Sequence, residues 1–322
     1  MAELPALVAP DSFKGTFSAR EVAAAVARGL RAAGREAVEL PVADGGEGTI
    51  DALLTTIAGE LRTVRVSDPL GRPVDASFAL IDGGRTGIVE MARASGLGLV
   101  AEGERDAWAA STRGTGELIV AAVEAGAERV IVTVGGSATT DGGAGALEAM
   151  SGTRVEMHVL CDVRTPFEDA PRVFGPQKGA DAALVRKLEE RLDRLAETFD
   201  RDPRGQPMTG CAGGLSGALW AQHEAQLQDG PSFVLGALGF DERMRESAFV
   251  VTGEGRIDEQ TLQGKLVGEV ATRCRQAGVP CHGIVGRIDL DPFAQRILDF
   301  ASLTEATTLE ELEEAGRRLV ES

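Results

Sequence analysis

Three of the chain's four lysines stand directly beside glycine, in the pairs Lys14-Gly15, Lys178-Gly179 and Gly264-Lys265. The remaining basic residues are arginines, so lysine is used sparingly. Lysine presents a compact point charge that suits phosphate or carboxylate, and a neighbouring glycine lets backbone approach the same anion. The pairs therefore indicate places where an anionic ligand binds, although surface lysines in turns would give the same pattern.

A glycine-rich segment at 135–145 follows an apolar run and leads into a helical pattern. Such a loop can direct several backbone N–H groups and a helix N-terminus at an anion. It matches neither the P-loop nor the dinucleotide-binding fingerprint, so the pattern alone indicates a phosphate-like anion. A purely structural glycine turn is the alternative.

Several carboxylates also fall in glycine-rich segments or at the ends of apolar runs: Asp44, Glu47, Asp162, Glu254 and Asp258. A phosphoryl-transfer enzyme needs oxygen ligands for magnesium and can use a carboxylate to accept a hydroxyl proton. Any one of these residues could be a helix cap or a turn former. Two segments as unusual as 44–48 (DGGEG) and 253–256 (GEGR) in one chain favour a functional reading.

The elements that must position these residues alternate between strand and helix. Residues 6–9 and 38–42 read as strands, and between them Ser18 and Glu21 have the spacing of a capping box at a helix start. Residues 61–91 instead read as short strands joined by tight turns, which predicts antiparallel hairpins and the start of a second domain. The order predicts an α/β fold with a mostly parallel sheet, where ligands bind at the carboxyl ends of strands.

Composition narrows the class of protein further. The 322 residues carry a formal net charge of -17, which argues against a nucleic-acid or anionic-membrane surface. No apolar run is long enough to span a membrane and the first residues do not resemble a signal peptide, so a cytoplasmic location is expected. The four cysteines have no metal-binding spacing, which predicts buried thiols rather than zinc or disulfides.

Six segments together closely resemble the bacterial glycerate kinase family, in family order and over nearly the whole chain. They are 9–14 (APDSFK), 41–49 (PVADGGEGT), 112–118 (TRGTGEL), 135–145 (GGSATTDGGAG), 174–180 (FGPQKGA) and 252–258 (TGEGRID). The resemblance implies an ATP-dependent kinase that acts on D-glycerate with magnesium and usually gives 2-phosphoglycerate. Formation of 3-phosphoglycerate is the alternative within that activity.

The resemblance also implies two α/β domains with the active site in the cleft between them. Residues 1–64 and 246–322 would form a flavodoxin-like domain with a doubly wound parallel sheet. Residues 65–245 would form an inserted domain with a mixed sheet. The possibility of a homodimer stays open.

Roles follow from the resemblance residue by residue. Asp162 is expected to accept the proton of the attacking hydroxyl, and Lys14 to assist in catalysis. The residues expected to bind glycerate are Asp11, Ser12, Asp44, Glu47 and Arg256. Those expected to bind ATP phosphates are Gly135, Gly136, Ser137, Asp141, Lys178, Gly253 and Glu254. Asp44, Glu254 and Asp258 are the candidate magnesium ligands.

The sequence departs from the family pattern in three places. Only residues 151–156 join a predicted helix to the next strand, where the family usually has a longer stretch. Thr140 stands where asparagine is usual, and the chain stops early. The shortened stretch makes a catalytically impaired phosphate-ligand binding protein an alternative. A nicotinamide oxidoreductase would need a Gly-x-Gly-x-x-Gly turn after the first strand, and residues 11–16 do not form one.

Overall fold

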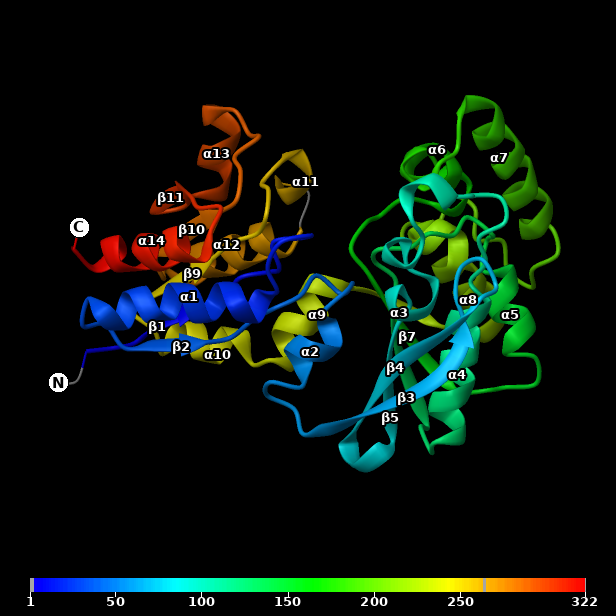
Figure 1. Ribbon diagram of the computed structural model, residues 1–322, viewed down its shortest axis with the longest axis horizontal. Coiled ribbons are helices and arrows are strands. Elements are labelled where there is room, and N and C mark those ends of the chain that lie inside the picture. The colour runs from blue at the N-terminus through cyan, green and yellow to red at the C-terminus, as the bar shows by residue number, and fades with distance from the viewer. Residues whose placement is uncertain (1–2, 263–264, 322) are drawn as a thin grey trace. The chain divides into compact units, whose positions relative to one another are not determined.

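The computed structural model describes residues 3–262 and 265–321. The chain forms two compact units, each with its own sheet (Figure 1). Unit 1 comprises Met1–Asp44, Asp51–Thr56 and Pro231–Ser322, and unit 2 comprises Gly45–Ile50 and Ile57–Gly230. Unit 2 thus lies between stretches of unit 1 in sequence, and the chain passes between the units earlier than the expected bounds at 64 and 245.

The sheet of unit 1 has five parallel strands in the order β11-β10-β9-β1-β2. The strands are β1 (Ala6–Val8), β2 (Ala37–Glu39), β9 (Phe249–Thr252), β10 (Cys281–Val285) and β11 (Ser302–Glu305). Numbered within the unit, the order from the β2 edge is 2-1-3-4-5, which is one of the common orders of doubly wound sheets. The direction of winding therefore reverses between β1 and β9.

Two long helices of unit 1, α1 (Ala19–Ala32) and α14 (Leu309–Glu321), lie side by side against the sheet (Figure 1). The predicted capping box opens α1, because the Ser18 hydroxyl accepts from the Glu21 amide and the Glu21 carboxylate accepts from the Ser18 amide. Val22, Val26 and Leu30 then bury one face of the helix. The other helices of this unit are α10 (Phe240–Arg245), α11 (Glu259–Leu262), α12 (Leu266–Ala277) and α13 (Pro292–Leu298).

The sheet of unit 2 has six strands in the sequential order β3 to β8. They are β3 (Gly59–Ser67), β4 (Pro73–Ile81), β5 (Thr86–Glu90), β6 (Arg129–Thr133), β7 (Glu156–Cys161) and β8 (Gln226–Asp229). The first three pair antiparallel, as predicted, and β5 to β8 are parallel. The carboxyl ends of β5 to β8 therefore meet at one edge of this sheet.

Helices of unit 2 pack their apolar sides on these strands. Leu118 of α4 and Leu215 of α8 join Val89, Val130 and Val132 in one buried core. The helices of this unit are α3 (Ala92–Ser95), α4 (Arg113–Glu124), α5 (Ala144–Ala149), α6 (Ala170–Phe174), α7 (Ala182–Ala196) and α8 (Leu215–His223). Helices α2 (Thr49–Leu53) and α9 (Gly230–Ala237) span the points where the chain passes between units.

Three further expectations can be compared with the structure. All four cysteines are buried free thiols, as predicted. Helix α5 is followed directly by a turn and then by β7 at Glu156, so the short connection leaves both elements intact. Among the described helices, none is long and apolar enough to cross a membrane.

Candidate active site

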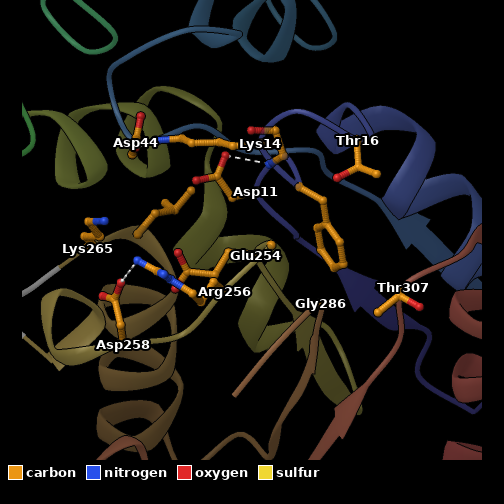
Figure 2. Close-up of a pocket in the computed structure, with 14 residues that line it drawn as sticks. Asp11, Lys14, Thr16, Asp44, Glu254, Arg256, Asp258, Lys265, Gly286 and Thr307 are labelled. Atoms are coloured by element: carbon orange, nitrogen blue, oxygen red, sulfur yellow. Dashed lines mark hydrogen bonds and ion pairs between the residues drawn. The ribbon is translucent and has the colours of Figure 1, made fainter. Parts of the chain in front are cut away.

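The loops at the carboxyl ends of all five parallel strands of unit 1 surround a cavity of about 450 Å³ (Figure 2). Residues 11–14 follow β1, Asp44 follows β2, residues 254–258 follow β9, Gly286 follows β10 and Thr307 follows β11. Doubly wound sheets bind ligands at this edge, next to the strands where the winding reverses. The cavity adjoins β1 and β9 and so occupies that position.

Lys14 and two carboxylates form one side of the cavity. The Lys14 Nζ lies 3.1 Å from Asp44 Oδ2, and Figure 2 shows its side chain extended toward Asp44. Asp11 is buried, and its Oδ1 accepts a hydrogen bond from the Ser12 amide at 2.6 Å. Burial and the neighbouring Asp44 raise the pKa of Asp11 well above its usual range, whereas Lys14 lowers it. This side of the cavity therefore favours a shared proton or an added cation.

Glu254 is the titratable group best placed to change its charge near neutral pH. Burial raises the pKa of Glu254 to about 7, against the opposing effects of a hydrogen bond from Thr261 and the charges of Lys265 and Lys14. The Thr261 hydroxyl donates to Glu254 Oε1 at 2.8 Å. A ligand that brings a cation into the cavity would therefore ionise Glu254.

Arg256 lies at the exposed rim of the cavity. Its guanidinium lies 3.0 Å from Asp258 Oδ2 and 3.6 Å from Asp289 Oδ2, and 59% of the side chain is exposed. Figure 2 shows Arg256 beside Asp258 and close to Glu254. An exposed guanidinium at a cavity rim can exchange these partners for a substrate carboxylate.

The three candidate magnesium ligands Asp44, Glu254 and Asp258 all line this cavity. Each is already bonded within the protein, to Lys14, Thr261 and Arg256 respectively. In the part of the chain that the structure describes, no three His, Cys, Asp or Glu residues converge to hold a metal. The oxygen donors suit magnesium, but only for an ion that arrives with ligands of its own.

The cavity thus brings together most of the residues expected to bind glycerate. It also holds Glu254, which was expected to bind ATP. Gly253 has a packing role in addition to any contact with ATP, because a Cβ there would collide with the carbonyl oxygen of Ile284 on β10. Lys265 lines the cavity too, and its glycine neighbour Gly264 lies outside the described residues.

The glycine loop lies in unit 2, after β6, and a second predicted segment packs against it. A Cβ at Gly135 would come within 2.8 Å of the Cα of Gly46, and the Thr133 hydroxyl donates to the Gly46 carbonyl at 3.3 Å. Glu47 is exposed in that segment and belongs to unit 2, whereas Asp44 belongs to unit 1. Gly135 therefore permits the close approach of the two loops, whatever else it contacts.

Lys178 lies beneath the glycine loop and is 1% exposed. Its Nζ donates to the Ser137 hydroxyl at 2.8 Å and to the Thr139 carbonyl at 2.6 Å. Burial lowers the pKa of Lys178 to about 7, although the charge of Asp141 opposes the shift. The loop thus has a cation directly behind it that is only partly charged at neutral pH.

The side chain of Asp141 accepts hydrogen bonds from other residues of the protein. It is 2% exposed and accepts hydrogen bonds from the Thr112 amide at 2.8 Å, the Thr112 hydroxyl at 2.9 Å and the Gly145 amide at 3.2 Å. These donors lie in or next to the first turns of α4 and α5. The carboxylate therefore fixes the end of the glycine loop to two helices.

Two other predicted positions lie in the same unit. Asp162 follows directly after β7, partly buried, next to the buried Cys161. Thr140, at the position where asparagine was expected, is fully buried and its hydroxyl has no hydrogen-bond partner among the described residues. The substitution therefore leaves one polar atom of the loop unsatisfied.

Sequence reasoning missed some residues that line the cavity: Thr16, Leu266 and Thr307. Thr307 follows the polar edge strand β11, which the sequence pattern did not reveal. Thr16 lies two residues after Lys14 in a predicted loop, so its position was available as a signal. Leu266 follows Lys265 and begins α12.

Both units are α/β structures with glycine-rich loops and charged side chains at the carboxyl ends of parallel strands, which is where α/β enzymes bind their ligands. The family model described as the glycerate kinase family matches residues 6–155 and 150–322. The two matches meet where the connection from α5 to β7 is short.

Individual relatives agree with the family model. The chain is 40% identical to a glycerate kinase of Bacillus subtilis over 88% of this chain and 85% of the relative. It is 37% identical to a glycerate 2-kinase of Escherichia coli, over 95% and 92%. A crystal structure from Salmonella typhimurium LT2, provisionally named glycerate kinase 2, matches with a TM-score of 0.82 at 33% identity, covering 99% of this chain and 98% of that one.

The chain belongs to the glycerate kinase family, as the six sequence segments predicted. It is therefore a kinase, an ATP-dependent phosphotransferase.

Proposed function

We propose that this protein transfers the γ-phosphoryl group of ATP to the 2-hydroxyl of D-glycerate and so forms 2-phosphoglycerate. One observation carries the proposal. This chain belongs to the glycerate kinase family, and the cavity at the strand ends of unit 1 is lined by Asp11, Ser12, Lys14, Asp44 and Arg256. These side chains offer the positive charges and hydrogen-bonding groups that can bind the carboxylate and hydroxyls of a small hydroxy acid. The name of the Escherichia coli relative supports the 2-hydroxyl as acceptor.

Glycerate binding would use the two cations of the cavity for the carboxylate and its acidic side for the hydroxyls. Lys14 and Arg256 carry the positive charge, and both are exposed enough to reach a ligand. Ser12, Asp11 and Asp44 would supply hydrogen-bonding groups for the two hydroxyls. Glu47, which belongs to unit 2, is also assigned to glycerate. Fixing both ends of a three-carbon acid in this way orients one hydroxyl for attack.

The phosphates of ATP would bind at the glycine loop. Gly136 is exposed and Ser137 is partly buried, so their backbone N–H groups could reach a phosphate, and the Lys178 ammonium behind Ser137 would stabilise its negative charge. Asp141 holds the loop in place, and Gly253 and Glu254 are the residues of unit 1 that we assign to phosphate binding. Phosphoryl transfer depends mainly on such positioning and charge stabilisation.

The hydroxyl proton would pass to Asp162, which lies at the carboxyl end of β7. Asp44, Glu254 and Asp258 are the residues that would supply one or two oxygen ligands to magnesium, whose other ligands would come from ATP. The three carboxylates already bond to Lys14, Thr261 and Arg256, so they suit an ion held partly by ATP better than an ion held by protein ligands alone. Bound magnesium would supply charge neutralisation at the phosphates.

A binding protein without turnover is the second candidate, and the short connection at residues 150–155 with the unsatisfied Thr140 hydroxyl is the observation that favours it. It would bind ATP and glycerate through the same loops and release no ADP. The two candidates make different predictions for one assay.

That assay measures ADP release by purified protein with Mg-ATP, with and without D-glycerate. The proposal predicts release that needs D-glycerate and that falls sharply in Lys14→Met, where the cavity loses a cation. Lys187→Met is the matched control, because Lys187 is an exposed lysine on α7. Glycerate-dependent thermal stabilisation without ADP release would instead identify a binding protein.

A further inference from the structure

Glu90, the last residue of β5, is a buried carboxylate that no expected role explains. It is 1% exposed. Its Oε1 accepts a hydrogen bond from the Ile50 amide at 2.6 Å, and its Oε2 accepts one from Arg93 Nε at 2.6 Å. Both hydrogen bonds are short and charge-assisted, so Glu90 fixes the backbone at Ile50 strongly.

Ile50 ends the segment 45–50, which runs across neighbouring strand ends of unit 2. Gly46 is held at β6, where its carbonyl accepts from Thr133 and its Cα packs on Gly135. Gly45 has a φ of 86°, and a Cβ there would lie 2.7 Å from the Cα of Gly230, just after β8. The ends of β5, β6 and β8 thus fix one short segment between them.

The two hydrogen bonds of Glu90 require a carboxylate. Its two oxygens face two donors, the Ile50 amide and Arg93 Nε, and a neutral amide side chain would place an N–H group against one of those donors. Its partner Arg93 is 25% exposed, so the ion pair reaches the surface at the carboxyl end of β5. An anchor at this place holds Glu47, which lies three residues before Ile50 in the same segment.

We propose that Glu90 is a positioning residue for glycerate binding: it fixes the segment 45–50, and thereby the position of Glu47. The inference rests on the proposed function, because it assigns Glu47 to glycerate. Glu90 itself would touch neither glycerate nor ATP. Its loss would therefore weaken glycerate binding more than ATP binding.

Asp68 offers a matched control in the same unit. Its carboxylate is 6% exposed, accepts hydrogen bonds from the Leu70 and Arg72 amides at 2.8 Å each, and pairs with Arg72 Nε at 2.6 Å. The chemistry thus matches that of Glu90, yet the turn that Asp68 holds carries no expected site residue. A purely structural role of Glu90 predicts that the two positions behave alike.

The experiment compares Glu90→Gln with Asp68→Asn in steady-state kinetics and in thermal unfolding. The expected result for Glu90→Gln is a KM for D-glycerate raised by about tenfold or more, with the KM for Mg-ATP within about twofold of wild type. Asp68→Asn should leave both KM values within about twofold while lowering Tm by a similar amount. An active Glu90→Gln whose KM for glycerate equals that of Asp68→Asn would overturn the proposal.

Two further measurements keep the proposal testable whatever the first variant does. If Glu90→Gln does not fold, Thr133→Val removes the hydrogen bond to Gly46 with little change of shape. This variant should raise the KM for D-glycerate by a smaller factor, and an unchanged KM overturns the proposal.

If wild type does not turn over D-glycerate, the proposed function fails. Hydrogen exchange then tests the anchor alone: the Ile50 amide should exchange faster in Glu90→Ala and not in Asp68→Asn, and unchanged exchange in Glu90→Ala overturns it.

Discussion

If ATP phosphates bind at the glycine loop as proposed, the buried cation behind the loop should make ATP affinity depend on pH by an amount that can be calculated. Lys178 has a pKa of about 7 and lies one hydrogen bond of 2.8 Å from the Ser137 hydroxyl. If Ser137 donates to a phosphate oxygen, the ammonium lies roughly 5.5 Å from that oxygen, and one full charge contributes about 3 kcal/mol at an effective dielectric constant near 20. That energy corresponds to about a hundredfold in Kd and raises the pKa of Lys178 in the complex by about two units.

The direction of the pH effect follows from this linkage. The complex binds a proton more strongly than free protein, so ATP affinity is fully present below pH 7 and is lost as pH rises from about 7 to about 9. Lys178→Met removes the charge at every pH. The ratio of its Kd for ATP to that of wild type should therefore be about one hundred at pH 6 and about ten at pH 8.

Direct titration calorimetry with Mg-ATP and no glycerate measures this ratio. Titration of ATP itself cancels, because both proteins bind the same ligand at each pH. Lys187→Met, which alters an exposed lysine on α7, should match wild type throughout. A ratio that stays constant between pH 6 and 8, or a Lys178→Met variant that binds ATP as tightly as Lys187→Met, would refute the reasoning.

Other predictions concern single groups in either unit. Asp162→Asn should lower kcat by about a hundredfold or more while the Kd for Mg-ATP stays within about twofold, measured by ADP release and calorimetry; near wild-type kcat with normal pH dependence would show that another group accepts the proton. Glu254 has a folded pKa of about 7, above its usual value, so folded protein binds the extra proton and stability falls as pH rises from about 4.5 to 7. Glu254→Gln should lack this loss and gain on the order of 3 kcal/mol over wild type across that window in urea unfolding; a difference that does not change with pH would contradict the assignment. Thr140→Val removes an unsatisfied buried hydroxyl and should leave Tm equal or higher, which differential scanning calorimetry can check; a large fall in Tm would mean that the hydroxyl has a partner.

The sequence predicted those elements whose own residues carry a strong local signal. The capping box at Ser18 and Glu21 and the apolar face of α1 placed that helix correctly. The turns between the strands of residues 61–91 predicted the antiparallel part of the unit 2 sheet. In each case the pattern and the structure depend on the same neighbouring residues.

The strands β8 and β11 escaped prediction for a physical reason. Each lies at the edge of its sheet, is at most partly buried, and has a polar sequence, QLQD at β8 and SLTE at β11. Their pairing with β7 and β10 comes from long-range contacts that no local pattern records. Thr307, which follows β11, was missed at the cavity for the same reason.

In the candidate site, too, the sequence predicted some features and missed those that depend on long-range contacts. The rule that ligands bind at the carboxyl ends of parallel strands gathered Lys14, Asp44 and Glu254 correctly into one cavity. The sequence did not indicate that Lys178 is buried beneath its loop or that Asp141 is bonded to two helix ends. Glycine composition also cannot separate contact with a ligand from close packing, which is the observed role of Gly135 against Gly46.

The most direct test of the account is the identity of the product. Purified protein, Mg-ATP and D-glycerate should give a new phosphomonoester signal in phosphorus NMR that is split into a doublet by the single proton on carbon 2. A triplet from the two protons on carbon 3 would instead mean phosphorylation of the 3-hydroxyl and would contradict the proposed orientation of glycerate. The absence of any phosphomonoester under conditions in which the Bacillus subtilis glycerate kinase forms one would contradict the central claim itself.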